Sequence, residues 1–295
     1  MKIRIGVGMG ATTGDPSGFL DLVDDVDTLG FDSIWLPEVL TAPTLDPMVA
    51  LAYAAAHNTH LKLGTTMLLP GRNLVHLAKE SATLDALSRG RLLVTFVPGL
   101  PRQPESGAVG VAGPEKGRMM DEMLPVLRSL WAGETVTHHG DAADIEGVTL
   151  SPLPVQQPLE FWLGGMVPAA LERCGRFADG WLPSACTPEE VARARVVIDD
   201  AAAQAGRTID PEHFGVSIAY SRRPLDRTAI RALSAARKGI DPEQVVPVGM
   251  DGLRSLLERF LEVGFSKFVV RPLQHAEGWR SELEVLADGV LDLQT

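Results

Sequence analysis

The chain has 295 residues, a length that suits one (β/α)8 barrel of about 250 residues with insertions. Hydrophobic residues make up 45% and charged residues 22%, as in a globular protein with a large core. A net charge of −11 without a cluster of Lys or Arg makes nucleic acids and anionic membranes poor partners. With two cysteines, no signal peptide and no apolar run that could span a bilayer, the sequence predicts a soluble cytoplasmic protein.

Short strands without polar alternation, typical of buried parallel strands, recur along the chain. They are expected at residues 2–9, 33–36, 62–67, 91–97, 161–163, 179–183, 214–219 and 267–270. Helix start signals lie between them at Asp15-Pro16, Asp46-Pro47, Asn73 and the capping box Thr187–Glu190. Eight strands alternating with at least eight helices predict an α/β fold, a single (β/α)8 TIM barrel that forms one domain over residues 1–295.

Four segments depart from this alternation. Residues 135–150 are predicted to form a hairpin inserted after the fourth helix, and residues 222–239 a helical insertion near the C-terminal end. A closing helix is expected over residues 275–288. Residues 98–117 are rich in Gly and Pro, and a structureless segment of this length is usually a lid, a binding loop or disordered. Since it leaves the C-terminal end of a strand, where the active sites of barrels lie, we expect a lid.

A strand, a Gly-Gly turn and a helix start follow one another in the middle of the chain. The apolar strand Phe161–Leu163 is followed by Gly164 and Gly165, which allow a sharp turn and the close approach of a ligand. Pro168 then stands at the first helical position. Such a unit directs unpaired N–H groups and the positive end of a helix dipole at one point, which suits a phosphate. A strand-to-helix turn that only needs a positive φ would have the same sequence.

The strand ends favour holding a cofactor over direct attack on a substrate. Three of the six lysines begin strands at the opposite face, which disfavours a Schiff-base aldolase. No Gly-x-Ser-x-Gly motif occurs. His138 and His139 are adjacent on an expected strand and cannot chelate one metal, so no metal site is expected. The strand ends offer groups that suit a planar cofactor with its own reactivity. They are Glu38, Thr65, Thr66, Met67, Gly164, Gly165, Trp181, Ser184, Tyr220 and Arg271.

Several segments resemble the bacterial luciferase-like oxidoreductases. They are Gly30–Glu38, Leu63–Met67, Leu77–Arg91, Trp162–Gly165 and Asp179–Pro183. The resemblance extends over nearly the whole chain, and the most similar branch uses the deazaflavin coenzyme F420, whereas other branches use FMN. It implies a (β/α)8 barrel, usually dimeric, so we expect a homodimer that acts on a small-molecule substrate.

The resemblance also implies site residues. Glu38, Thr66 and Met67 would lie beside the ring system of the cofactor, with a non-proline cis peptide bond at Thr66–Met67. The substrate is expected at Met9, Gly99 and Arg271. The cofactor phosphate would be held by two further segments, which contribute Gly164, Gly165, Met166, Gly180 and Trp181.

The anionic groups of the cofactor other than its phosphate need partners outside the Gly164-Gly165 turn. The tail of F420 bears extra carboxylates and calls for exposed arginines outside the pocket. The candidates are Arg72, Arg102, Arg173 and Arg176, although a net charge of −11 predicts that most of them are already paired. Arg271, at the end of the last strand, is a candidate for an anionic substrate or for the cofactor tail.

The sequence departs from the resemblance at two strand ends. Many F420 enzymes carry Asp-His after the second strand, whereas this chain has Glu38-Val39 and lacks the histidine often assigned to proton handling. The fourth strand leaves through Val97–Gly99 without a carboxylate. Glu38 is therefore the one catalytic candidate. Three functions stay open: an F420-dependent hydride-transfer oxidoreductase, an FMN-dependent monooxygenase with a separate reductase, and a non-catalytic cofactor-binding protein.

Overall fold

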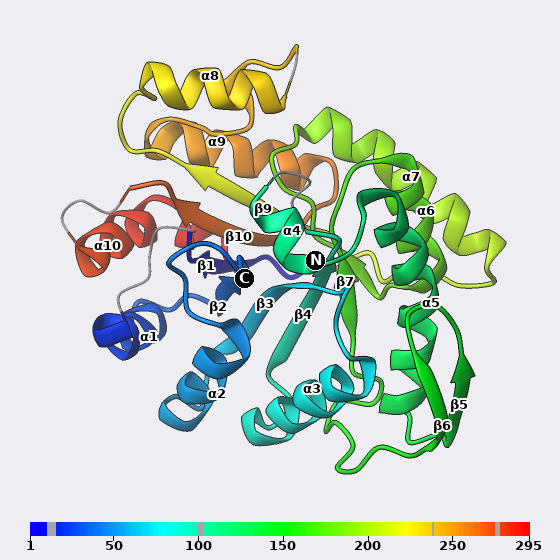
Figure 1. Ribbon diagram of the computed structural model, residues 1–295. Coiled ribbons are helices and arrows are strands. Elements are labelled where there is room, and N and C mark those ends of the chain that lie inside the picture. Colours follow the sequence, from blue (N-terminus) through cyan, green and yellow to red (C-terminus); the bar gives the residue numbers. More distant parts are fainter. Residues whose placement is uncertain (11–15, 100–102, 238, 275–277) are drawn as a thin grey trace.

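Eight parallel strands form one sheet in the computed structural model, which describes residues 1–10, 16–99, 103–237, 239–274 and 278–295 (Figure 1). Hydrogen-bonded neighbours follow the order β8-β7-β4-β3-β2-β1-β10-β9. The strands are β1 Arg4–Gly8, β2 Ser33–Pro37, β3 Lys62–Leu68, β4 Leu92–Val97, β7 Phe161–Leu163, β8 Gly180–Trp181, β9 Gly215–Tyr220 and β10 Lys267–Pro272.

The two outer strands of this order, β8 and β9, join each other. Parallel bridges connect Trp181 with Phe214 and Ser184 with Ser217. The amide of Ser217 donates to the carbonyl oxygen of Pro183 at 2.8 Å. The sheet therefore returns on itself, and the predicted (β/α)8 TIM barrel is confirmed.

Helices surround the barrel, as Figure 1 shows. They are α1 Phe19–Thr28, α2 Pro47–His57, α3 Leu74–Ser88, α4 Glu105–Val109, α5 Gly113–Trp131, α6 Pro168–Phe177, α7 Pro188–Gln204, α8 Arg227–Ala236, α9 Gly249–Glu262 and α10 Trp279–Val290. The predicted hairpin is present as β5 Val136–His139 and β6 Asp144–Val148, and α8 is the predicted helical insertion. No helix in the described ranges is long and apolar enough to cross a membrane.

Local capping fixes several helix starts where the sequence predicted them. The side chain of Asp46 accepts from the amide of Val49 at the start of α2, and Asn73 caps α3 in the same way. Thr187 and Glu190 form both bonds of a capping box at the start of α7.

Three predicted boundaries differ from the structure. The first α-helix begins at Phe19, after a short 3-10 turn, and Asp15 lies outside the described residues. The closing helix begins at Trp279, and His275 also lies outside the described residues. The prediction that residues 98–117 are structureless is wrong, because α4 and the first turn of α5 form within this segment.

A small apolar cluster fills the lumen of the barrel near the strand starts, apart from the main core between the strands and the helices. It consists of Trp35, Leu182, Val269, Leu93 and Trp162. A Cβ added to Gly64 would overlap the ring of Trp35, and one added to Gly180 would overlap the ring of Trp162. The two glycines therefore make room for the two indoles inside the barrel.

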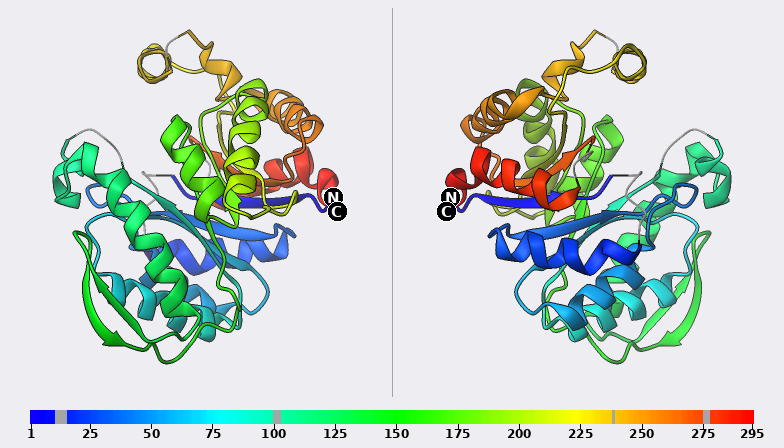
Figure 2. Two further views of the ribbon diagram at one scale, coloured as in Figure 1. Left: turned by 90° about the vertical axis from the view of Figure 1, so that its right-hand side faces the viewer. Right: turned by 90° about the vertical axis from the view of Figure 1, so that its left-hand side faces the viewer.

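The two ends of the barrel differ. In Figure 2 the chain termini lie at one end, and α4 lies at the other. The first end carries the starts of the strands, where the amide of Thr295 donates to the carbonyl oxygen of Ile3. The second end carries the carboxyl ends of the strands, where barrel active sites lie.

Substituting Gly64 by Ala should destabilise the protein, because the new methyl group overlaps the Trp35 ring in a packed lumen. Overpacking of this kind costs about 1–3 kcal/mol of unfolding free energy. Gly18→Ala is the control, since a Cβ there has no neighbour within 4 Å. Urea denaturation of both variants measures the difference, and equal midpoints would contradict the packing described.

Candidate functional site

Strand β3 presents Thr66 to the mouth of the barrel. The side chain of Met67 is fully buried in the core between strands and helices, so alternation places Thr66 on the lumen side. The predicted cis peptide bond at Thr66–Met67 is wrong. Cis bonds in the described ranges all precede proline, and β3 pairs in register with β2 and β4 through this point. A strand that is paired in register on both sides leaves no bulge for the predicted isomer.

Small residues surround the mouth. Gly8 ends β1 and Gly164 directly follows β7, both on the lumen side. A Cβ added to Gly8 would lie 3.4 Å from the Cβ of Arg271, and one added to Gly164 would lie 2.8 Å from Cγ1 of Val97. The missing side chains at these two positions therefore let Val269, Arg271 and Val97 pack directly against bare backbone.

The Gly-Gly turn after β7 has the geometry of an anion cradle. Gly165 has a φ of 104°, which an L side chain rarely adopts. The amides of Gly165, Met166 and Val167 donate to no group in the part of the chain that the structure describes. Val167 precedes α6 and offers no side-chain cap. Three free N–H groups therefore stand at the positive end of α6.

Trp181 supports this turn from behind. Its indole Nε1 donates to the carbonyl oxygen of Gly165 at 3.0 Å, while its ring is fully buried against Phe265. Gly180 lies one step earlier in β8, against the ring of Trp162. Of the predicted phosphate-binding residues, Gly164, Gly165 and Met166 thus lie in the turn, whereas Gly180 and Trp181 pack beneath it.

The predicted substrate residues lie at three different strand ends. Met9 follows β1 and is buried, with its amide donating to the carbonyl oxygen of Trp35 at 2.8 Å. Gly99 follows β4 and has a φ of 81°. Arg271 lies in β10 beside Gly10.

Glu38 is held by two neighbours. It is buried, accepts from the amide of Leu68 at 2.7 Å and pairs with Arg72, whose Nε also donates to the carbonyl oxygen of Leu68 at 2.9 Å. Burial raises the pKa of the Glu38 carboxyl, and the opposing effects of Arg72 and the Leu68 amide do not cancel this shift. The carboxylate thereby ties the end of β2 to the turn after β3.

Glu105 attaches α4 to the loop that follows β2. Its buried carboxylate accepts from the amide of Leu40 at 2.9 Å, the amide of Thr41 at 3.1 Å and the hydroxyl of Thr41 at 2.8 Å. Burial alone would raise the pKa of Glu105, but these hydrogen bonds and the charge of Lys116 leave it below its usual value. This carboxylate is not among the residues predicted from the sequence, because it comes from α4 and not from the end of β4.

Two cations at this end of the barrel have no hydrogen-bond partner within the described ranges. Arg271 forms no hydrogen bond or ion pair there, and burial lowers the pKa of its guanidinium. Lys116 is 4% exposed, and its Nζ has no hydrogen-bond partner. The sequence contained a signal for this burial, because Lys116 precedes the buried Met120 and Met123 on one face of α5. The charge of Lys116 is partly compensated by the Glu105 carboxylate. An uncompensated buried charge is costly, so an anionic group that reached Arg271 would be favoured.

The arginines expected outside the pocket are mostly paired. Arg72 binds Glu38, and Arg173 binds Asp121 and the carbonyl oxygen of Gly117. Arg176 is exposed and lies 4.6 Å over the ring of Phe177. Arg102 lies outside the described residues.

Other reactive groups are bound elsewhere or buried. His138 contacts Glu122, whereas its neighbour His139 contacts Asp144. Over the described residues, no group of three His, Cys, Asp or Glu could hold a metal ion. Burial raises the pKa of Cys186 to about 12 and that of Cys174 further, so neither thiol is a nucleophile near neutral pH.

Comparison with known proteins identifies the relatives of this chain. Residues 1–291 match the family described as luciferase-like monooxygenase. An F420-dependent glucose-6-phosphate dehydrogenase of Microbacterium testaceum is 26% identical over 94% of this chain and 87% of the relative. Limonene 1,2-monooxygenase of Rhodococcus erythropolis is 29% identical, over 67% of this chain and 53% of the relative.

Solved structures share the fold. An F420-dependent secondary alcohol dehydrogenase in complex with an F420-acetone adduct has a TM-score of 0.84 at 19% identity, with complete coverage of both chains. The F420-dependent tetrahydromethanopterin reductase of Methanopyrus kandleri has a TM-score of 0.79 at 18% identity, again over both complete chains. A type II Baeyer-Villiger monooxygenase of Pseudomonas putida in complex with FMN has a TM-score of 0.75 at 19% identity, over 100% of this chain and 99% of that one.

Glu105→Gln should loosen α4 and destabilise the protein by about 1–3 kcal/mol at pH 7, because the amide group of Gln cannot accept all three hydrogen bonds. The stabilisation by Glu105 is complete above the usual pKa of 4.5 and is lost as the pH falls through the lower pKa of the folded state. Unfolding free energies of the variant and the original chain should therefore converge in acid.

The matched control is Glu115→Gln, since Glu115 is exposed on the first turn of α5. Its effect should stay within about 0.5 kcal/mol at every pH. Should the Glu105 and Glu115 variants behave alike at pH 7, the attachment of α4 would be refuted.

Proposed function

Because the chain belongs to the luciferase-like monooxygenase family, we propose that it is an oxidoreductase that uses coenzyme F420 to transfer a hydride to or from a small organic substrate. The relative that covers 94% of the chain is an F420-dependent dehydrogenase. The structural likeness to two further F420-dependent enzymes agrees with this choice of cofactor.

The turn at Gly164-Gly165 is the observation that carries the proposal. F420 carries a phosphate on its ribityl chain, and the free amides of Gly165, Met166 and Val167 would hold that phosphate at the start of α6. The ring system would lie at the strand ends that carry Gly8 and Gly164. Thr66 and the backbone of Met67 would line its edge.

When bound, the deazaflavin supplies or accepts the hydride. The protein therefore has to bind and orient the cofactor and the substrate and to exclude water. Glu105 holds α4 against the loop after β2, which would keep α4 over the mouth and water out of it. Glu38 is bound to Arg72 and Leu68 and would shape the wall of the site. We assign it no proton transfer, since both of its oxygens already accept hydrogen bonds.

Arg271 would select the substrate. Its guanidinium lies beside Gly10 at the mouth and lacks an anionic partner in the described part of the chain. A carboxylate or phosphate on the substrate would supply that partner by a charge-assisted, bidentate contact. The tail of F420 is the other anion that this arginine could receive.

An FMN-dependent monooxygenase is the second candidate, favoured by two comparisons. Limonene 1,2-monooxygenase matches 67% of the chain, and a structural neighbour contains FMN. FMN also carries a phosphate on a ribityl chain, so the turn at Gly165 would fit either cofactor. Affinity for the two cofactors separates the candidates, because only F420 has the additional anionic tail.

We predict that the protein binds F420 more tightly than FMN and that the affinity falls as the salt concentration rises. Gly165→Asp should abolish binding, because it adds a negative charge beside the free amides at a φ of 104°. Fluorescence titration with each cofactor measures both effects.

Gly165→Ala is the matched control, since it introduces the same backbone strain without the charge. It should bind F420 more weakly than the original chain but more tightly than Gly165→Asp. Tighter binding of FMN would show that the cofactor is wrong, and normal binding by Gly165→Asp would show that the site is wrong.

A further inference from the structure

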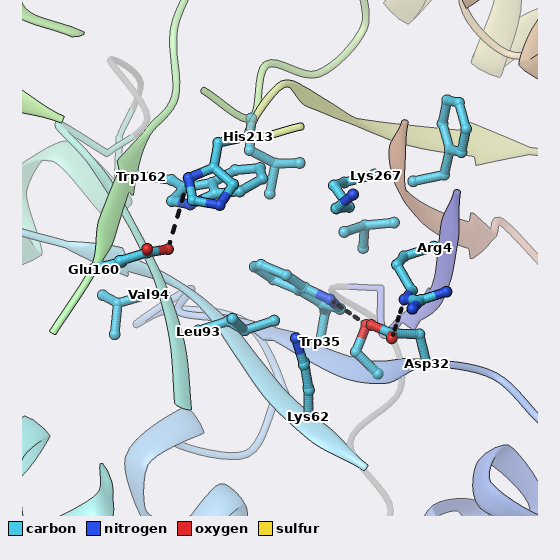
Figure 3. A pocket seen from close by; sticks show the side chains of 14 residues that line it. Arg4, Asp32, Trp35, Lys62, Leu93, Val94, Glu160, Trp162, His213 and Lys267 are labelled. Atoms are coloured by element: carbon cyan, nitrogen blue, oxygen red, sulfur yellow. Dashed lines mark hydrogen bonds and ion pairs between the residues drawn. The ribbon is translucent and has the colours of Figure 1, made fainter. Parts of the chain in front are cut away.

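A cavity opens at the starts of the strands, at the opposite end of the barrel from the proposed cofactor site (Figure 3). Its volume is about 110 Å³, close to the roughly 150 Å³ of an engineered protein cavity that binds benzene. Its lining includes no residue of the upper mouth such as Thr66, Gly164 or Arg271. It is therefore separate from the proposed cofactor site.

The inner wall of this basal pocket is aromatic and apolar. Trp35 and Trp162 contribute their indole rings, with Leu93, Leu182 and Val269 beside them. The ring of Trp162 contacts that of His213, with 5.6 Å between centroids and a tilt of 36° between the ring planes. Since Gly64 and Gly180 make room for the two indoles, the shape of the wall is fixed by the strands themselves. Such a wall suits a single flat ring.

Among the described residues that form the polar rim, one cation has no partner. Arg4 pairs with Asp32 at 3.2 Å, and His213 lies 3.7 Å from Glu160. Lys62 is exposed and forms no hydrogen bond or ion pair with any described residue. Its ammonium group points toward the indole of Trp35 in Figure 3.

A neighbouring lysine adds to the positive potential at this rim. Nζ of Lys267 donates to the carbonyl oxygen of Lys2 at 2.7 Å and lies 3.7 Å from Glu212. Burial is the main cause that lowers the pKa of Lys267, and the charge of Lys62 acts in the same direction. An anion near Lys62 would reduce the repulsion between the two ammonium groups.

We propose that this basal pocket is a second ligand site, which takes a small monocyclic aromatic carboxylate. Its ring lies against Trp35 and Trp162, and its carboxylate binds the ammonium group of Lys62. Trp162 lines the same cavity, and its indole N–H forms no hydrogen bond with any described residue. The site is independent of the cofactor and of the reaction at the other end.

Titration of the full chain with benzoate tests the proposal, followed by tryptophan fluorescence and by calorimetry. One benzoate should bind per chain and change the fluorescence, because two of the five tryptophans line the pocket. Lys62→Met should weaken benzoate binding at least about tenfold, which corresponds to about 1.4 kcal/mol. Lys62→Arg should restore most of the affinity. Benzyl alcohol, which has no charge, should bind both the original chain and the Met variant equally.

Two controls separate this site from the cofactor site. Lys2→Met removes an exposed lysine at the same end that does not line the pocket, so benzoate affinity should not change. Gly165→Asp should also bind benzoate normally, and F420 should not compete, whatever the outcome of the cofactor titrations. The proposal is overturned if benzoate shows no saturable binding or if Lys62→Met leaves its affinity unchanged. The proposal is also overturned if F420 competes with benzoate or if Gly165→Asp loses benzoate binding, because benzoate would then bind at the cofactor site.

Discussion

The close packing of two indoles against bare backbone inside the barrel is the constraint on which the rest depends. Gly64 and Gly180 lack the side chains that would otherwise fill the lumen, and Trp35 and Trp162 occupy that space. The lumen is thereby filled by aromatic rings near the strand starts, whereas the strand ends present bare backbone at Gly8 and Gly164. The two indoles thus separate the upper mouth from the basal pocket, and they line the basal pocket.

Local groups, and not the net charge, decide where anions can bind. The chain carries a net charge of −11, yet Arg271 is largely buried without a partner in the described ranges, and Nζ of Lys116 is buried there without a hydrogen bond. The free amides after Gly164 add a third positive feature at the same end of the barrel. Buried positive groups held without partners cost stability, which is expected where a ligand supplies the missing charge.

Sequence patterns predicted the parts of the fold that depend on neighbours in the chain. The strands, the caps at Asp46 and Thr187 and the Gly-Gly turn follow from local chemistry and were found. Features that depend on contacts between distant segments were missed, such as the hydrogen bonds of Glu105 with Thr41 across 64 residues. The wrong prediction of a cis bond at Thr66–Met67 rested on the family resemblance alone. The in-register pairing of β3 leaves no place for such a bond.

Hydrogen exchange with and without F420 tests the central claim most directly. If the cofactor phosphate binds the free amides at the start of α6, exchange at Gly165, Met166 and Val167 should slow markedly when F420 is bound. Exchange in α4 should slow as well, because α4 is expected to cover the filled mouth. Unchanged exchange at these three amides, under conditions that saturate the protein with F420, would contradict the account.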